Sequence, residues 1–195
     1  MKHSLHTVLT LLFVCASAWG ENVPWQNPQI NEINREPAHA HFIPYTNEAN
    51  ALKQQALPAA QRFAVNPATE RRISLDGTWK FLFSKNNEEC PTDFYKMGYN
   101  TKRWKDIQVP GSWELQGFDS PIYTDVAYPF PANPPHVPTD YNPVGAYVRE
   151  FTVPAHWKGM DIFLDFEGVE SAFYCWVNGE LAGYSDCLLY TSPSP

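Results

Sequence analysis

Charged residues are scarce in this sequence, and those of positive sign are the scarcest. Only 18% of the 195 residues are charged, and 14 Lys and Arg stand against 21 Asp and Glu, which gives a net charge of −7. Binding to nucleic acid or to an anionic membrane surface requires a basic face. The charge balance therefore weighs against both partners and is compatible with a neutral ligand.

Long hydrophobic runs are also missing. The apolar run from Val8 to Ala16 is too short to span a bilayer, and no later stretch is apolar enough for a membrane helix. The run follows Lys2 and precedes small residues that extend to Gly20, which is the order of a secretory signal peptide. We therefore expect residues 1–20 to be a signal peptide and the protein to be exported, to the periplasm or outside the cell.

Cysteine is rare as well, with four in the whole chain. An exported protein can form disulfides, but Cys90 falls in a polar stretch and Cys175 falls inside an apolar strand pattern. Spacing alone does not decide whether these two pair. His39 and His41 are close in sequence, yet two histidines alone seldom form a metal site, so we assign no metal ligands.

Aromatic and other apolar residues are abundant, at 15% and 44% of the chain. This amount suffices for one domain with a hydrophobic core. Residues 21–72 are polar and weakly periodic, so we expect an extended N-terminal arm lying on the folded body, with room for one short helix within 47–63.

Short segments of alternating character follow the arm. Trp79, Phe81 and Phe83 alternate with more polar residues, which predicts a strand with one buried face. Asn178-Gly179 is the strongest hairpin signal in the chain. Further strands are expected at 107–109, 147–153, 162–166, 172–177 and 181–184. Because no helical crossovers separate them, the pattern predicts an all-β sandwich.

The segment 128–143 differs from its neighbours because it contains six prolines interleaved with Tyr128, Phe130 and Tyr141. Proline-rich stretches serve as linkers or as ligands for other domains. Here the aromatic residues favour a rigid loop packed on the sandwich, since proline lowers the entropy lost on ordering.

Eight motifs in matching order resemble the opening of β-galactosidases of glycoside hydrolase family 2. The resemblance covers roughly residues 27–185, and the proline-rich block favours β-galactosidases over the family's glucuronidases and mannosidases. The motifs are Asn27-Pro28 with Asn34-Arg35-Glu36-Pro37, Leu75-Asp76-Gly77-Thr78-Trp79, Val109-Pro110-Gly111-Ser112-Trp113-Glu114, Pro121-Ile122-Tyr123-Thr124-Asp125-Val126, Asn142-Pro143-Val144-Gly145, Phe166-Glu167-Gly168-Val169, Trp176-Val177-Asn178-Gly179 and Gly183-Tyr184-Ser185.

The resemblance implies a jelly-roll-like, galactose-binding-like sandwich domain at residues 73–186. We expect this domain to be truncated before its last strands. Residues 187–195 depart abruptly from the family pattern and resemble the translation of a transposon-based sequencing adapter. We therefore expect them to be a non-native tail, and the natural sequence to end here at or near Asp186; a natural divergent tail is the alternative.

Family members are retaining glycosidases whose two catalytic glutamates lie in a later barrel domain. The resemblance therefore implies no catalytic residue within this chain. The local carboxylates Asp76, Asp165, Glu167 and Glu170 are interpreted as turn or solvent residues. One substrate contact carries over: Asp125 stands where the family commonly has an Asn that contacts the bound galactosyl group. The alternative for Asp125 is a plain turn residue.

The implied full-length enzyme releases terminal non-reducing β-D-galactose from β-galactosides, with homo-oligomers as the expected assembly. Mg²⁺ and Na⁺ are its possible cofactors, and none is assignable within this chain. Two alternatives remain open: a non-catalytic carbohydrate-binding module, and a relative that acts on β-glucuronides or β-mannosides.

Overall fold

The structure is a computed structural model that describes residues 23–37, 39, 42–58, 69–121, 130–133 and 136–186. Three sequence predictions lie outside the described residues: the signal peptide at 1–20, the substrate contact at Asp125 and the non-native tail at 187–195. Within the described part of the chain, no helix is long and apolar enough to cross a membrane.

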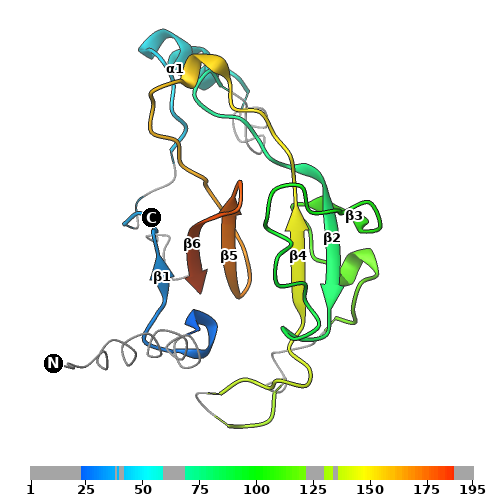
Figure 1. Ribbon diagram of the computed structural model, residues 1–195. Coiled ribbons are helices and arrows are strands. Elements are labelled where there is room, and N and C mark those ends of the chain that lie inside the picture. The colour runs from blue at the N-terminus through cyan, green and yellow to red at the C-terminus, as the bar shows by residue number, and fades with distance from the viewer. Residues whose placement is uncertain are drawn as a thin grey trace, which may run out of the picture.

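The described chain is an all-β sandwich built from two antiparallel three-stranded sheets (Figure 1). The first sheet has the order β1-β6-β5, and the second has the order β3-β2-β4. The strands are β1 (Glu32–Ile33), β2 (Gly77–Ser84), β3 (Lys105–Val109), β4 (Val144–Val148), β5 (Ala172–Val177) and β6 (Glu180–Asp186). The helical elements are short: η1 (Pro24–Gln26), α1 (Glu48–Gln55), η2 (Glu114–Gln116) and η3 (Ala155–Trp157).

Strand β2 is the centre of the second sheet and confirms the predicted strand. The prediction that only one face is buried holds for the first half of β2, where Thr78 and Lys80 are open to solvent, but not for the second half. Phe81 is fully buried on one face, beneath the rings of Trp113 and Phe118. Leu82 packs on the opposite face, against a cluster that contains Trp104 and Ala146. The end of β2 near Leu82 and Ser84 is therefore covered on both faces, whereas Thr78 and Lys80 on the same face are open to solvent, and Lys80 pairs there with Asp106.

The hairpin of β5 and β6 forms where Asn178-Gly179 predicted it. Both residues have positive φ, 53° and 93°, which a two-residue hairpin turn of this type requires. Tyr174 pairs with Tyr184 across the two strands, and their ring centroids lie 4.6 Å apart. The hairpin therefore carries an aromatic face.

The N-terminal arm lies on the folded body, as predicted, and it also extends a sheet. Strand β1 pairs antiparallel with β6, so that Ile33 lies opposite Tyr184, and the Arg35 guanidinium donates to Ser185 Oγ at 2.9 Å. The predicted helix is α1, whose first turn is capped by the Asn47 side chain accepting from the Asn50 amide. Further along, the buried Trp157 indole donates to the Glu70 carbonyl at 2.8 Å.

Aromatic residues of the segment between β2 and β3 connect the two sheets. Phe94 contacts both Trp104 and Trp176, with centroid separations of 5.9 and 5.8 Å. Tyr95 stacks on Trp176 at 4.9 Å with the ring planes 12° apart. Large aromatic side chains contribute the most buried apolar area per residue, which explains why this connection serves as core.

One predicted strand is displaced in the described structure and another is absent. Strand β4 ends at Val148, and Phe151 and Val153 beyond it are each 41% exposed, so the predicted strand 147–153 was too long. Residues 162–166 were predicted as a strand and form none, and Phe163 is 67% exposed. The alternation of residues 162–166 is real, but a strand also requires a hydrogen-bonded neighbour, and no described strand pairs with this segment.

The cysteine question has a clear answer in the described structure. Cys90 and Cys175 are both free thiols, so the pairing left open by the sequence does not occur. Cys90 was placed in a polar stretch, yet it is only 8% exposed and belongs to the cluster with Trp104. Burial raises the pKa of both thiols and keeps them protonated.

Candidate functional site

The described structure places the two ends of the segment that carries Asp125, although Asp125 itself lies outside the described residues. One end leaves the turn after β3 at Asp119 to Pro121, and the other returns through Tyr141 and Asn142 into β4. The geometry of these two ends defines how the sandwich holds the segment between them.

A phenol–carboxylate hydrogen bond joins the two ends. The Tyr141 hydroxyl donates to Asp119 Oδ1 at 2.7 Å, and the Ser120 amide donates to the same oxygen at 2.7 Å. This hydrogen bond to the carboxylate, followed by desolvation, raises the pKa of Tyr141, so the phenol stays protonated and remains a donor. Residues 119 and 141 are thereby held together across the segment.

The returning end is also bound to the sheet. The Asn142 amide donates to the Lys85 carbonyl at 2.9 Å, just beyond β2. The Asn86 side chain donates to the Asp140 carbonyl at 3.3 Å. Backbone attachments of this kind define where a loop enters and leaves a sheet, so the segment begins and ends at fixed points of the sandwich.

The turn after β3 forms the base of the site. Gln116 bonds back to Gln108 through both its side-chain oxygen, which accepts from the amide at 2.8 Å, and its nitrogen, which donates to the carbonyl at 3.0 Å. Trp113 packs edge-on against Phe83, with centroids 5.9 Å apart. The motif around Trp113 thus acts as a packed corner rather than as a flexible loop.

The four carboxylates singled out in the sequence are not arranged as a catalytic pair in the described structure. Asp165 and Glu167 do come together, but around Arg72, whose Nη2 lies 4.0 Å from Asp165 Oδ2 and 3.0 Å from Glu167 Oε1. Asp76 and Glu170 are exposed residues that lie outside the helices and strands. Asp165 and Glu167 thus share one cationic partner, whereas the acid of a glycosidase pair lies in an environment that favours its protonated form.

Metal ligands do not gather in the described part of the chain, where no group of three or more His, Cys, Asp or Glu residues is placed to hold an ion. His39 stacks obliquely on Phe42, with ring centroids 5.4 Å apart. His41, which is close to His39 in sequence, lies outside the described residues.

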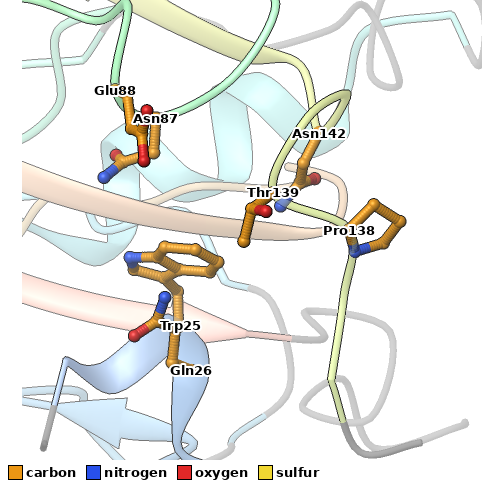
Figure 2. Close-up of a pocket in the computed structure, with 7 residues that line it drawn as sticks. All are labelled: Trp25, Gln26, Asn87, Glu88, Pro138, Thr139 and Asn142. Carbon is orange, nitrogen blue, oxygen red and sulfur yellow. The ribbon is translucent and has the colours of Figure 1, made fainter. Parts of the chain in front are cut away.

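Sequence reasoning missed one feature, a hollow of about 140 Å³ between three segments (Figure 2). Trp25 and Gln26 come from η1, Asn87 and Glu88 from the turn after β2, and Pro138, Thr139 and Asn142 from the proline-rich segment. No motif could have revealed it, because its three walls are separated by 50 or more residues in sequence and meet only in the folded chain.

The fold and the site together define a β-sandwich domain of two antiparallel sheets, with hydrogen bonds from Tyr141 and Asn142 that attach the end of the proline-rich segment to the sandwich. The chain belongs to glycoside hydrolase family 2: the family described as "Glycosyl hydrolases family 2, sugar binding domain" matches residues 73–189.

Curated relatives agree with this membership. A "Beta-galactosidase" of Priestia megaterium (strain DSM 319 / IMG 1521) is 42% identical over 164 residues, which is 82% of this chain and 15% of the relative. A "Beta-galactosidase" of Halalkalibacterium halodurans is 38% identical over 170 residues, covering 85% of this chain and 16% of the relative. A "Beta-galactosidase" of Psychromonas ingrahamii is 38% identical over 161 residues, which is 83% of this chain and 14% of the relative. The chain thus spans about 15% of the length of these relatives.

Proposed function

We propose that this chain is the N-terminal part of a β-galactosidase that hydrolyses terminal non-reducing β-D-galactose residues in β-galactosides. The observation that carries the proposal is the 42% identity to a protein named beta-galactosidase over 82% of the chain. The family match at residues 73–189 supports it independently. In this proposal the sandwich is an accessory to chemistry performed elsewhere in a longer protein.

Retaining hydrolysis requires a carboxylic acid that protonates the leaving oxygen and a carboxylate that attacks the sugar, about 5–5.5 Å apart. The described sandwich contributes neither group in this proposal. Its role is to position the segment that carries Asp125, whose ends are held by the Tyr141–Asp119 hydrogen bond and by the Asn142–Lys85 hydrogen bond.

Asp125 is the proposed substrate contact. An ionised carboxylate only accepts hydrogen bonds, whereas the Asn common in the family also donates. Sugar hydroxyls donate readily, so an Asp at this position can accept from a galactose hydroxyl. This proposal depends on the resemblance of Pro121-Ile122-Tyr123-Thr124-Asp125 to the family motif.

Three further properties of the longer enzyme belong to the proposal. The order of Lys2, the apolar run 8–16 and Gly20 supports export. The family resemblance supports Mg²⁺ and Na⁺ as cofactors of the complete enzyme, with no described residue assigned as a ligand. It supports a homo-oligomer as well.

The test is hydrolysis by the full-length protein. Purified enzyme is assayed with nitrophenyl β-galactoside, β-glucuronide and β-mannoside, and the configuration of the released sugar is followed by NMR. We expect selective hydrolysis of the galactoside with retention. Preference for the glucuronide or mannoside would move the protein to another specificity of the family, and sugar binding without hydrolysis would identify a non-catalytic module.

A further inference from the structure

The hollow between η1, the turn after β2 and the proline-rich segment combines one aromatic ring with several uncharged polar groups (Figure 2). The Trp25 indole lies beside Thr139, with Gln26 on one side and Asn87 and Glu88 on the other. The amides and the hydroxyl offer both donors and acceptors. An apolar ring with convergent polar groups is the usual composition of a small-ligand site.

The walls of this hollow are held in place before any ligand arrives. The Trp25 amide donates to the Tyr174 hydroxyl of β5 at 3.3 Å, and Tyr174 stacks in turn on Trp176 with centroids 5.5 Å apart. The turn after β2 is braced by the Glu89 amide, which donates to Asn86 Oδ1 at 2.9 Å. Asn142 is fixed to Lys85 at 2.9 Å. Preorganised walls lose little entropy on binding.

The charge of the hollow selects the ligand class. Among the described residues that line it, Glu88 is the only ionisable one, and no Lys, Arg or His contributes. A phosphate or carboxylate would find no cation and would be repelled by Glu88, whereas a polyol can donate hydroxyl hydrogens to it. At about 140 Å³ the hollow is smaller than sites for drug-sized ligands, which limits it to about one sugar ring.

We propose that this hollow binds one neutral hexopyranose unit, with the apolar face of the sugar on the Trp25 indole and its hydroxyls on Gln26, Thr139 and Glu88. The site is built entirely from described residues and excludes residues 122–129, which contain Asp125. It therefore gives the sandwich a sugar contact of its own, separate from the proposed substrate contact and independent of hydrolysis.

The experiment uses the full chain labelled with 5-fluorotryptophan and observed by ¹⁹F NMR, with the Trp25→Phe variant assigning the Trp25 resonance. Methyl β-D-galactopyranoside is the neutral probe and D-galacturonate is the anionic one. We expect the neutral probe to shift the Trp25 resonance saturably, with a Kd on the order of millimolar. The anionic probe should bind roughly threefold or more weakly, and Glu88→Gln should reduce that difference.

Matched glutamines provide the control. Gln26 lines the hollow and Gln29 does not, although both are exposed residues of the same short segment. Gln26→Ala and Thr139→Ala should each weaken binding about two- to tenfold, the range for one hydrogen bond. Gln29→Ala should leave it unchanged. The remaining tryptophan resonances report whether each variant keeps its fold.

An unshifted Trp25 resonance at about 100 mM probe, far above the expected millimolar Kd, would overturn the inference. So would equal effects of Gln26→Ala and Gln29→Ala, or tighter binding of the anion. If the full-length protein lacks β-galactosidase activity, the proposed function is wrong, but sugar binding measured at Trp25 is unaffected. The failure of the proposed function and the failure of this inference are therefore distinguishable.

Discussion

At the scale of single residues, Gly145 in β4 shows how close packing constrains a sequence. A Cβ atom at this position would lie 2.4 Å from Trp113 Cζ3 and 2.7 Å from Phe81 Cε2. Both neighbours are rings with little freedom to move, since Phe81 is fully buried. The absence of a side chain at Gly145 is what lets the Trp113 corner close on the sheet.

We expect Gly145→Ala to destabilise the protein by about 1–3 kcal/mol, the usual cost of overpacking a filled core. Urea unfolding followed by tryptophan fluorescence measures this as a lower midpoint. Gly168→Ala is the matched control, because a Cβ atom there meets nothing within 4 Å. Equal midpoints for the two variants would contradict the packing described around Trp113.

Asp125 provides the residue-scale test of the proposed active-site contact. In the full-length enzyme, Asp125→Ala should lower kcat/KM roughly 10- to 150-fold, because a hydrogen bond involving a charged group contributes about 1.5–3 kcal/mol. Asp125→Asn should be mild, since it keeps an acceptor oxygen. If Asp125 is only a turn residue, the melting temperature falls instead and kcat/KM stays constant.

Tyr184 makes stability depend on alkaline pH. Burial, reinforced by the Asp186 carboxylate, raises the pKa of Tyr184 to about 12. The folded state thus holds the proton more tightly than the unfolded chain, whose tyrosines titrate near 10. The contribution to stability is complete below about pH 10 and is lost as the pH rises toward 12.

Replacing Tyr184 by Phe removes this titration. Between pH 9 and pH 11 the wild-type protein should lose about 1 kcal/mol more unfolding free energy than Tyr184→Phe does. Urea unfolding at a series of pH values measures the difference. If the unfolding free energies of the two proteins fall in parallel between pH 9 and pH 11, the inference that burial raises the pKa of Tyr184 is wrong.

At the scale of elements, the attachment of β1 to β6 depends on a close backbone approach. A Cβ atom at Gly183 would lie 2.8 Å from the Ile33 carbonyl oxygen, and a backbone oxygen cannot move aside as a flexible side chain can. The same pairing includes the Asp186 amide, which donates to the Asn31 carbonyl at 3.0 Å. Glycine at 183 is therefore required for the arm to extend the sheet.

Gly183→Ala should displace the arm while leaving the second sheet intact. Native-state hydrogen exchange at the Asp186 amide should accelerate by about tenfold or more, since this amide would exchange through local opening. Amides of β2 should keep their protection. The Gly168→Ala variant serves again as the control, and unchanged protection at Asp186 in Gly183→Ala would mean that the arm is held by other contacts.

At the scale of the whole molecule, the described carboxylates are placed for ion pairs and turns. Glu167 and Asp165 surround Arg72, and Asp106 pairs with Lys80 at 2.6 Å. A retaining glycosidase needs two carboxyl groups about 5–5.5 Å apart, one of them in an environment that keeps it protonated, whereas Asp165 and Glu167 both face the Arg72 cation. In the proposed function, the two catalytic carboxylates therefore come from outside the described sandwich.

We accordingly expect the purified 195-residue chain to show no turnover of nitrophenyl β-galactoside. Both a general acid and a nucleophile are needed, and single carboxylates do not replace the pair. The full-length enzyme, assayed in parallel, is the positive control. Turnover by the chain alone, surviving a second purification, would contradict this assignment of roles.

Sequence patterns predicted the secondary structure correctly where residue type or spacing within a few residues sets the backbone conformation. Asn178-Gly179 favours positive φ through residue type alone, and Trp79, Phe81 and Phe83 alternate as a strand requires, so both predictions held. The prediction for 162–166 failed for a non-local reason. Its alternation is typical of a strand, but a strand is defined by a neighbour's hydrogen bonds, and no described strand supplies them.

The sequence by itself determined the fold class, the family and the hairpin, because these depend on residue types at short and ordered spacings. Only the tertiary structure decided that Cys90 and Cys175 stay apart as free thiols, and that the second half of β2, around Leu82, is covered on both faces. It alone brought Trp25, Glu88 and Thr139 around one hollow. Such contacts join residues far apart in the chain, and their geometry depends on how the two sheets and the arm pack rather than on any local pattern.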